Sequence, residues 1–144
     1  MGKTEPGKQH SGMQKTDCEK ELKLVGLSAH TSKKAKDFSL GMKQRLGIAI
    51  ALLGNPKVII LDEPINGLDP IGVTEIRNLV TDLCKIKNIT FLISSHNLPE
   101  LYQVAAHYFF IDNGKIVKSI GLEELGNESL EDYFLSLTGG NKNE

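Results

Sequence analysis

The sequence predicts an α/β fold in which parallel strands are joined by helical crossovers and followed by a C-terminal β-hairpin and helices. The continuous apolar run at residues 58–61 and the segment Thr-Phe-Leu-Ile-Ser at 90–94 are typical of strands covered on both faces. The segment between them has apolar residues at helical spacing. The hairpin is predicted by Asn113-Gly114, because both residue types accept the positive φ angles of a two-residue turn.

The first half of the chain contains two helical patterns. Residues 18–25 fit a short helix, and Gly26 is placed to end it. A stronger pattern starts at Ser39, a residue type that caps helix N-termini, and stops at residues 54–56, Gly-Asn-Pro. The strand at 58–61 follows directly.

The second half alternates helices and strands. The crossover helix begins at Asp69-Pro70, with Asp as its cap and Pro in its first turn. After the strand at 90–94, we expect a short helix from Asn97 to about Ala106. The remaining elements are a strand at 108–111, a return strand at 116–120 and helical residues at 121–137.

The length of 144 residues fits one ordinary domain. Residues 1–16 are rich in glycine and lysine and have little to bury, so we expect a disordered tail there. We expect the domain to occupy residues 17–137 and residues 138–144 to fray.

Composition excludes several classes of protein. The net charge is −1, from 17 Lys and Arg against 18 Asp and Glu, which excludes a strongly basic nucleic-acid binder. The apolar run at 48–53 is far shorter than the ~20 residues that cross a bilayer, and no secretory signal is expected. The two cysteines, Cys18 and Cys84, indicate reduced thiols in a cytosolic protein rather than a metal or disulfide framework.

Two adjacent acids follow the first strand. Asp62 and Glu63 stand at its carboxyl end, which is where ligands bind in open α/β sheets. An acid in this place can hold Mg²⁺ directly or through water, and the next acid can orient a water on a phosphate. Taken alone, such a pair is more often a pair of solvated loop charges.

Three further segments carry weaker signals. Ser39 and Gly41 form a helix N-terminus that an anion can approach, although an ordinary serine cap also explains them. A turn followed by an Asp cap explains residues 66–70 adequately, without any functional role. His96 follows the second strand and is expected at the same sheet edge as the two acids, where a structural histidine remains the alternative.

Together, the order and spacing of these segments resemble the ATP-binding subunit of ABC transporters. The resemblance covers residues ~18–137 and implies part of a P-loop NTPase (RecA-like) core. The segment SLGMKQRLGIAIALLGNP is similar to the corresponding segment of the bacitracin-resistance and lantibiotic-immunity group of these subunits. The matching segments are the signature at 38–42, the Walker B strand and its glutamate at 58–63, the D-loop at 66–69 and the switch histidine, His96.

The resemblance implies a role for each matching residue. It assigns Mg²⁺ binding through water to Asp62, polarisation of the attacking water to Glu63, and contact with the γ-phosphate of ATP to His96. It places Ser39 and Gly41 against the ATP of the opposite subunit and has Asp69 couple two sites across a head-to-tail dimer. Leu40 and Met42 depart from the usual glycine and glutamine of the signature, but the serine and second glycine that face phosphate are present.

The family also has an upstream phosphate-cradling loop, G-x-x-x-x-G-K-[ST]. Residues 2–8 match its glycines and lysine, but Gln9 stands where Ser or Thr is needed, Pro6 lacks an amide hydrogen, and no strand precedes the match. We therefore expect a truncated C-terminal part of the domain that does not hydrolyse ATP alone. We also expect an unpaired sheet edge that makes the chain oligomerise or require a partner.

The implied function is an ATP-binding and ATP-hydrolysing subunit of an ABC transporter for peptide-antibiotic export or immunity. The implied partners are a second ABC ATPase subunit and a membrane permease, at the cytoplasmic face of the membrane, with no nucleic acid. Two alternatives remain: a non-enzymatic module that presents its signature to an intact subunit, and an inert remnant. Soluble DNA-repair and translation proteins share these motifs, but the compact hairpin and short tail favour the transporter branch.

Overall fold

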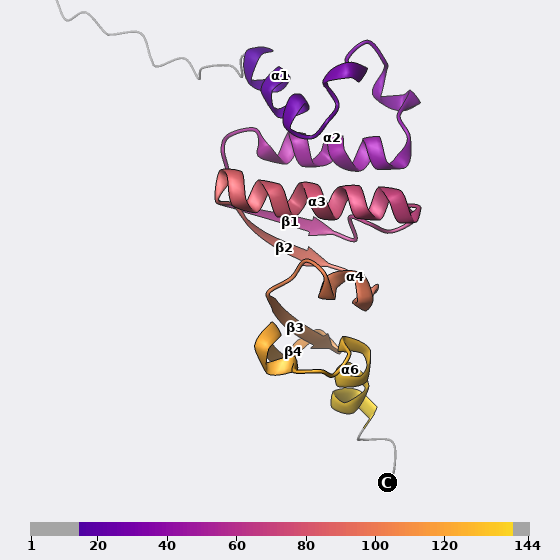
Figure 1. The fold of residues 1–144 in the computed structure, drawn as a ribbon, viewed down its shortest axis with the longest axis vertical. Helices are drawn as coiled ribbons and strands as arrows, with labels where there is room; N and C mark the ends of the chain where they lie inside the picture. Colours follow the sequence, from indigo (N-terminus) through magenta and orange to yellow (C-terminus); the bar gives the residue numbers. More distant parts are fainter. Residues whose placement is uncertain (1–14, 140–144) are drawn as a thin grey trace, which may run out of the picture. The chain divides into compact units, whose positions relative to one another are not determined.

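The computed structural model describes residues 15–139 (Figure 1). The chain divides between Ile59 and Ile60 into two compact units, and each is described by itself. The tail expected at 1–16 lies outside the described residues up to residue 14, as do residues 140–144 of the expected frayed end. The first helix already begins at Lys15, two residues before the expected start of the domain.

The first unit is helical. It contains α1 (Lys15–Leu24), two short 3₁₀ turns (Ser28–His30 and Ala35–Asp37) and α2 (Leu40–Leu52). Helix α1 ends at Leu24 and is terminated by Gly26, whose φ is +74°. The N–H of Leu27 donates to the carbonyl of Leu22 at 2.8 Å, and that of Gly26 donates to Lys23 at 3.1 Å. This is the Schellman termination that a glycine makes possible, so the predicted end of the helix is confirmed.

Helix α2 begins where Ser39 caps it. The Oγ of Ser39 accepts a hydrogen bond from the N–H of Met42 at 3.2 Å, which confirms the predicted cap. Helix α1 packs against α2. The buried apolar residues of this unit include Val25, Leu27, Ile48, Ala49 and Leu52.

Strands β1 (Val58–Asp62) and β2 (Thr90–Ser94) pair in a parallel two-stranded sheet, and α3 (Pro70–Lys87) is the crossover between them (Figure 1). Helix α3 begins after Asp69, whose Oδ1 accepts the N–H of Gly72 at 2.7 Å, as its sequence predicted. The buried residues of α3 follow one stripe along the helix: Ile76, Val80 and Leu83.

The expectation that both strands are covered on both faces is wrong. Ile60 of β1 is 72% exposed and Leu92 of β2 is 49% exposed, whereas Ile59 is buried. Ile93 of β2 lines a small apolar cavity together with residues of α3. A β-branched run therefore predicted the strands, but it did not specify how many layers cover them.

Strands β3 (His107–Asp112) and β4 (Lys115–Gly121) form the predicted antiparallel hairpin. Its turn residues, Asn113 and Gly114, have φ angles of 48° and 75°, as a type I′ turn requires. Within the described residues β3 pairs with β4 alone, as the predicted hairpin requires. The local Asn-Gly turn determines this pairing, whereas apolarity alone does not identify a strand's neighbour.

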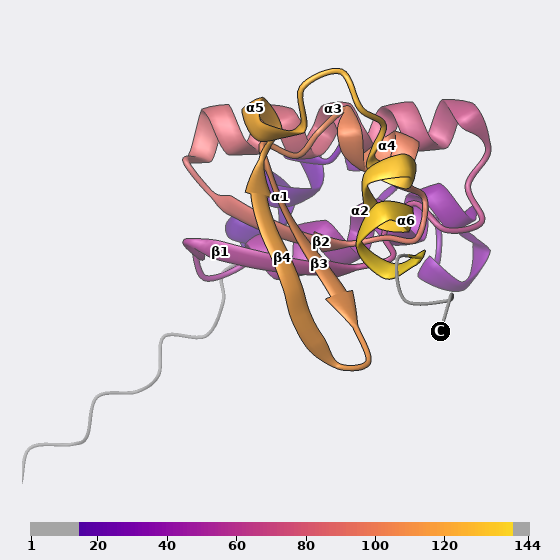
Figure 2. The ribbon, with the colours of Figure 1, turned by 90° about the horizontal axis from the view of Figure 1, so that it is seen from below.

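The hairpin packs against short helices: α4 (Leu98–Tyr102), α5 (Leu122–Leu125) and α6 (Leu130–Gly139). Helix α4 ends before the expected Ala106, and a break at Gly126 (φ 62°) divides the helical stretch expected at 121–137. Figure 2 shows α5 at the end of the hairpin opposite its turn. The buried cluster consists of Tyr108, Phe110, Ile120, Leu125 and Leu130, with Tyr133 and Phe134 against it. No helix within residues 15–139 is both long and apolar enough to span a bilayer.

Candidate functional site

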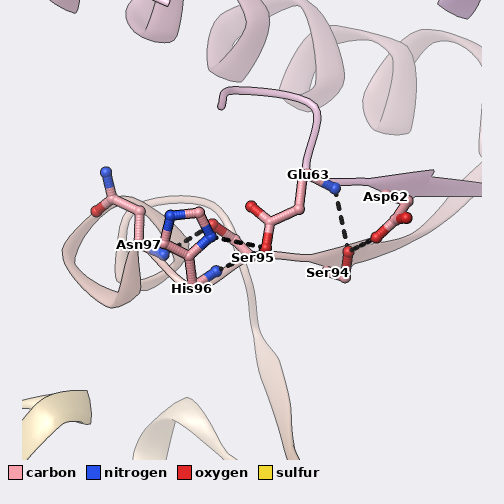
Figure 3. Close-up of polar contacts among 6 residues, drawn as sticks. All are labelled: Asp62, Glu63, Ser94, Ser95, His96 and Asn97. Atoms are coloured by element: carbon pink, nitrogen blue, oxygen red, sulfur yellow. Dashed lines mark hydrogen bonds and ion pairs between the residues drawn. The ribbon is translucent and has the colours of Figure 1, made fainter. Parts of the chain in front are cut away.

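The carboxyl ends of β1 and β2 bring the predicted polar residues together (Figure 3). Asp62 is the last residue of β1 and Glu63 follows it, while Ser94 is the last residue of β2 and precedes the loop that carries His96. Neighbouring parallel strands end at one edge of a sheet, where α/β proteins bind ligands. The structure therefore confirms that Asp62, Glu63 and His96 gather at one place.

Glu63 and His96 are in direct contact. The Nδ1 of His96 lies 2.9 Å from Oε1 of Glu63, and the backbone N–H of His96 donates to the same oxygen at 3.1 Å. The Glu63 side chain is 31% exposed and that of His96 is 72% exposed, so the contact is open to solvent on the histidine side. Since an ionised carboxylate only accepts hydrogen bonds, this contact uses a proton on Nδ1.

Asp62 is linked to Glu63 through a residue to which the sequence analysis gave no role. The Oγ of Ser94 donates to Oδ1 of Asp62 at 2.5 Å and accepts the N–H of Glu63 at 3.1 Å. The available signal was its position: a hydroxyl at the end of the strand beside the one that carries the acids. From the sequence alone, Ser94 is predicted only as the last residue of a strand.

The backbone and second oxygen of Glu63 are also unusual. Its φ is +46°, in the left-handed region that non-glycine residues adopt at an energetic cost. Its Oε2 is shielded from solvent and has no hydrogen-bond partner within the described residues. Such orphaned acceptors are rare in folded proteins, and they concentrate where a bound water, ion or substrate supplies the missing donor.

The donors at this edge fit Mg²⁺ rather than a transition metal. No group of three or more His, Cys, Asp or Glu side chains within residues 15–139 could enclose a metal ion. Mg²⁺ needs no such cage, because it keeps several waters and is held by one or two carboxylates together with substrate phosphates. The exposed Asp62 carboxylate and the adjacent Ser94 hydroxyl supply oxygen donors of this kind.

The loop after β2 is supported from α3. Arg77 of α3 contacts Glu100 of α4, with Nη1 3.3 Å from Oε2, and its Nη1 also donates to the side-chain oxygen of Gln103. The N–H of Leu101 donates to the carbonyl of Asn97, the residue after His96. This network ties α4, and with it the residues next to His96, to the crossover helix.

The other predicted residues lie elsewhere in the chain. Asp69 uses its carboxylate to cap α3, and Ser39 and Gly41 stand at the start of α2 in the first unit. For Asp69 and Ser39, the structure shows the capping role that the sequence analysis offered as the alternative.

Comparison with known proteins identifies the family. The sequence profile described as "ABC transporter" matches residues 3–66. A bacitracin transport ATP-binding protein from Bacillus licheniformis is 46% identical over 128 residues, which are 89% of this chain and 42% of that protein. A lantibiotic transport ATP-binding protein from Streptococcus pyogenes is 49% identical over 113 residues, 78% of this chain and 48% of that protein.

The chain belongs to the ABC transporter family of ATP-binding proteins. A crystal structure of an ATP-binding cassette of an ABC transporter in its ADP conformation matches this ABC-type fold with a TM-score of 0.75 and 34% identity. The match covers 87% of this chain and 49% of that cassette. The family and the α/β P-loop NTPase fold predicted from the sequence are therefore confirmed. The ABC chain spans less than half the length of the curated relatives described above.

Proposed function

We propose that this chain carries the hydrolysis half of an ABC-type ATP site. In this proposal Asp62 holds Mg²⁺ through water, Glu63 polarises the attacking water and His96 contacts the γ-phosphate. The observation that carries the proposal is the Glu63–His96 contact: it occupies Oε1 of Glu63 with two donors and leaves the shielded Oε2 without any partner. A water on the reacting phosphate is a donor of the kind that Oε2 lacks.

The same contact decides which ring nitrogen of His96 is left for a phosphate. The Nδ1 of His96 is engaged with Oε1 of Glu63. A hydrogen bond from the imidazole to a phosphate oxygen then uses Nε2. Mg²⁺, when bound, neutralises charge on the phosphate oxygens. The protein's own residues orient the water and position the phosphate.

The signature and D-loop residues would serve a second ATP site across a dimer. Ser39 and Gly41 stand at the N-terminus of the 13-residue helix α2, where N–H groups and the helix dipole favour an anion. We propose that this end faces the ATP of an opposite subunit and that Asp69 couples the two sites in a head-to-tail dimer. The capping hydrogen bond of Ser39 is compatible with contact to a phosphate, because Ser39 is exposed.

We further propose that this chain does not hydrolyse ATP by itself. In P-loop enzymes, most of the contacts that bind the phosphates come from a glycine-rich loop between a strand and a helix. Among the described residues before α2 there is no strand to precede such a loop. The weak match at residues 2–8 lies outside the described part of the chain.

The names of the relatives support a transport role. Bacitracin and lantibiotics are peptide antibiotics, and the relatives are named for their transport. We propose that the assembled protein couples ATP hydrolysis to peptide-antibiotic export or immunity, at the inner face of the membrane and together with a permease subunit.

An ATPase assay with a matched variant tests the enzymatic part. The full chain is assayed for phosphate release with Mg²⁺-ATP, alone and mixed with an intact relative such as the bacitracin transport protein of Bacillus licheniformis. We expect no turnover by the chain alone above that of its Glu63→Gln variant. Turnover by the chain alone that disappears in Glu63→Gln would contradict the proposed dependence on further residues.

The alternative of a non-enzymatic partner module is favoured by the exposed signature serine at a capped helix start. It predicts ATP-dependent association with the intact relative and unchanged association by the chain's Glu63→Gln variant. A pull-down with and without Mg²⁺-ATP measures this. Failure to associate in both conditions would exclude the module and leave the inert remnant.

A further inference from the structure

We propose that Ser94 is a positioning residue that fixes the Asp62 carboxylate and the backbone of Glu63 at the same time. The proposal rests on the proposed function of these two acids and adds a residue that acts through them. Ser94 is the last residue of β2, and Figure 3 shows its hydroxyl between the end of β1 and the amide of Glu63.

The hydroxyl of Ser94 is used in both directions. It donates its only proton to Oδ1 of Asp62 at 2.5 Å, and a lone pair of the same oxygen accepts the N–H of Glu63 at 3.1 Å. A hydroxyl is the smallest side-chain group that donates and accepts at one atom. An alanine or valine side chain at this position would break both bonds, whereas threonine would retain the chemistry.

Both partners benefit from being held. Asp62 is exposed at a strand end, so its unrestrained side chain samples several χ1 rotamers, and its terminal torsion has a broad distribution as well. The bond to Oδ1 fixes the direction of the carboxylate and leaves Oδ2 available to a water of a metal ion. Glu63 has a φ of +46°, and its amide is shared between the Oγ and the carbonyl of Ser94, the latter at 3.2 Å. Ser94 therefore anchors the strained residue whose side chain reaches His96.

The next residue provides an internal contrast. Ser95 has the same side chain, but its Oγ accepts the N–H of Asn97 at 3.0 Å, a bond within its own loop. Its hydroxyl bonds neither acid in the structure. Ser95→Ala is consequently a matched control that removes a neighbouring hydroxyl without breaking the link between Asp62 and Glu63.

Solution NMR of the full chain tests the link directly. Threonine and valine have the same shape, so Ser94→Thr and Ser94→Val differ in the hydroxyl alone, and both residue types are compatible with a strand. Side-chain couplings should show one Asp62 rotamer in the wild type and Ser94→Thr, and averaging in Ser94→Val. Exchange of the Glu63 amide should rise about 3- to 10-fold in Ser94→Val, as expected for the loss of one hydrogen bond. It should stay within about 2-fold of wild type in Ser95→Ala, whose hydrogen bond lies elsewhere.

A metal titration tests the consequence for the site. Mn²⁺ is added with ATP, and the paramagnetic broadening of signals near Asp62 gives its affinity. We expect the affinity to fall about 3- to 10-fold in Ser94→Val and to recover in Ser94→Thr. If Ser94→Val averages the Asp62 rotamers and speeds the exchange of the Glu63 amide but binds Mn²⁺ with the affinity of the wild type, the positioning role is overturned.

The two proposals fail in distinguishable ways. If wild type shows no broadening near Asp62 with Mn²⁺ and ATP, metal binding by this site fails, but the rotamer and amide-exchange data still decide the role of Ser94. If Ser94→Val leaves the Asp62 rotamer and the Glu63 amide indistinguishable from Ser95→Ala, the role of Ser94 is refuted whatever the metal does.

Discussion

Glu63 and His96 are joined twice through one oxygen. The Oε1 of Glu63 receives the backbone N–H of His96 at 3.1 Å and lies 2.9 Å from its Nδ1. The glutamate thus holds both the loop and the ring of the histidine. The other oxygen, Oε2, is left without a partner among the described residues. One side chain therefore serves a positioning purpose and still has an acceptor available for chemistry.

The contact predicts that Glu63→Ala and Glu63→Gln differ in their effect on His96. The amide oxygen of glutamine can accept both hydrogen bonds, but alanine accepts neither. We expect the His96 amide to exchange about 5-fold or more faster in Glu63→Ala, and within about 2-fold of wild type in Glu63→Gln. The measurement is amide exchange together with the ¹⁵N shifts of the imidazole ring.

The same pair separates structure from catalysis. In an assembled, active ATPase, Glu63→Gln should abolish hydrolysis while it preserves the arrangement of the loop. An imidazole ring whose ¹⁵N shifts are the same in Glu63→Ala as in wild type would show that the contact with Glu63 does not exist in solution.

The cap of α3 predicts a measurable loss of stability at Asp69. Its Oδ1 accepts the N–H of Gly72 at 2.7 Å, and Asp69→Ala leaves that donor without its partner. We expect the free energy of unfolding to fall by about 0.5–2 kcal/mol, the usual range for losing an N-cap. Urea unfolding measures the change.

Asp69→Asn is the matched variant, because asparagine caps helices about as well as aspartate. It should unfold close to wild type, and it changes only the charge that the proposed dimer coupling would use. Equal destabilisation by alanine and asparagine would mean that the carboxylate contributes through charge rather than through the cap.

Much of the candidate site could be predicted from sequence because strand ends are local features. Apolar runs located β1 and β2, so Asp62, Glu63 and His96 were expected at one edge, and the structure places them there. The direct bond between Glu63 and His96 needed coordinates, since side-chain rotamers decide which of several neighbouring polar groups meet. Ser94 was not identified from the sequence for the same reason, because its importance lies in two contacts to residues at the end of the neighbouring strand.

The fold could be predicted element by element, but the number of layers that cover each strand could not. Gly26, Ser39, Asp69 and the Asn113-Gly114 turn act on adjacent residues, and each was assigned correctly. The second layer over a strand depends on distant segments. The sequence accordingly misled on the covering of Ile60.

The hairpin core predicts losses of stability of very different size for two adjacent phenylalanines. Phe110 is 6% exposed, with its ring 5.4 Å from that of Tyr133 and 6.0 Å from that of Phe134, whereas Phe109 is 51% exposed. Phe110→Ala should lower the free energy of unfolding by about 3–5 kcal/mol, as large-to-small core changes do. Phe109→Ala should cost less than about 1 kcal/mol.

Chemical denaturation of both variants measures this difference, and circular dichroism checks whether Phe110→Ala still folds. If it does not fold, the milder Phe110→Leu should lie between wild type and unfolded, while Phe109→Leu stays near wild type. Similar losses at both positions would contradict the strand alternation that buries Tyr108 and Phe110 together.

The thiol of Cys84 on α3 predicts a pH dependence of stability. Burial raises its pKa above the ordinary value of 9.0, although a backbone hydrogen bond partly opposes the rise. The folded chain therefore retains this proton at a pH where the unfolded chain loses it. It follows that the contribution to the free energy of unfolding is present below pH 9 and is lost as the pH rises above it.

Alkylation kinetics provide the corresponding measurement, because the thiolate is the reactive form. Cys84 should react with iodoacetamide several-fold more slowly in the native chain than in urea, and site-resolved mass spectrometry distinguishes it from Cys18. Cys84→Ser should remove the corresponding part of the stability loss above pH 9. A native rate equal to the rate in urea would mean that the packing of α3 does not protect this thiol, and the assigned cause of the pKa shift would then be wrong.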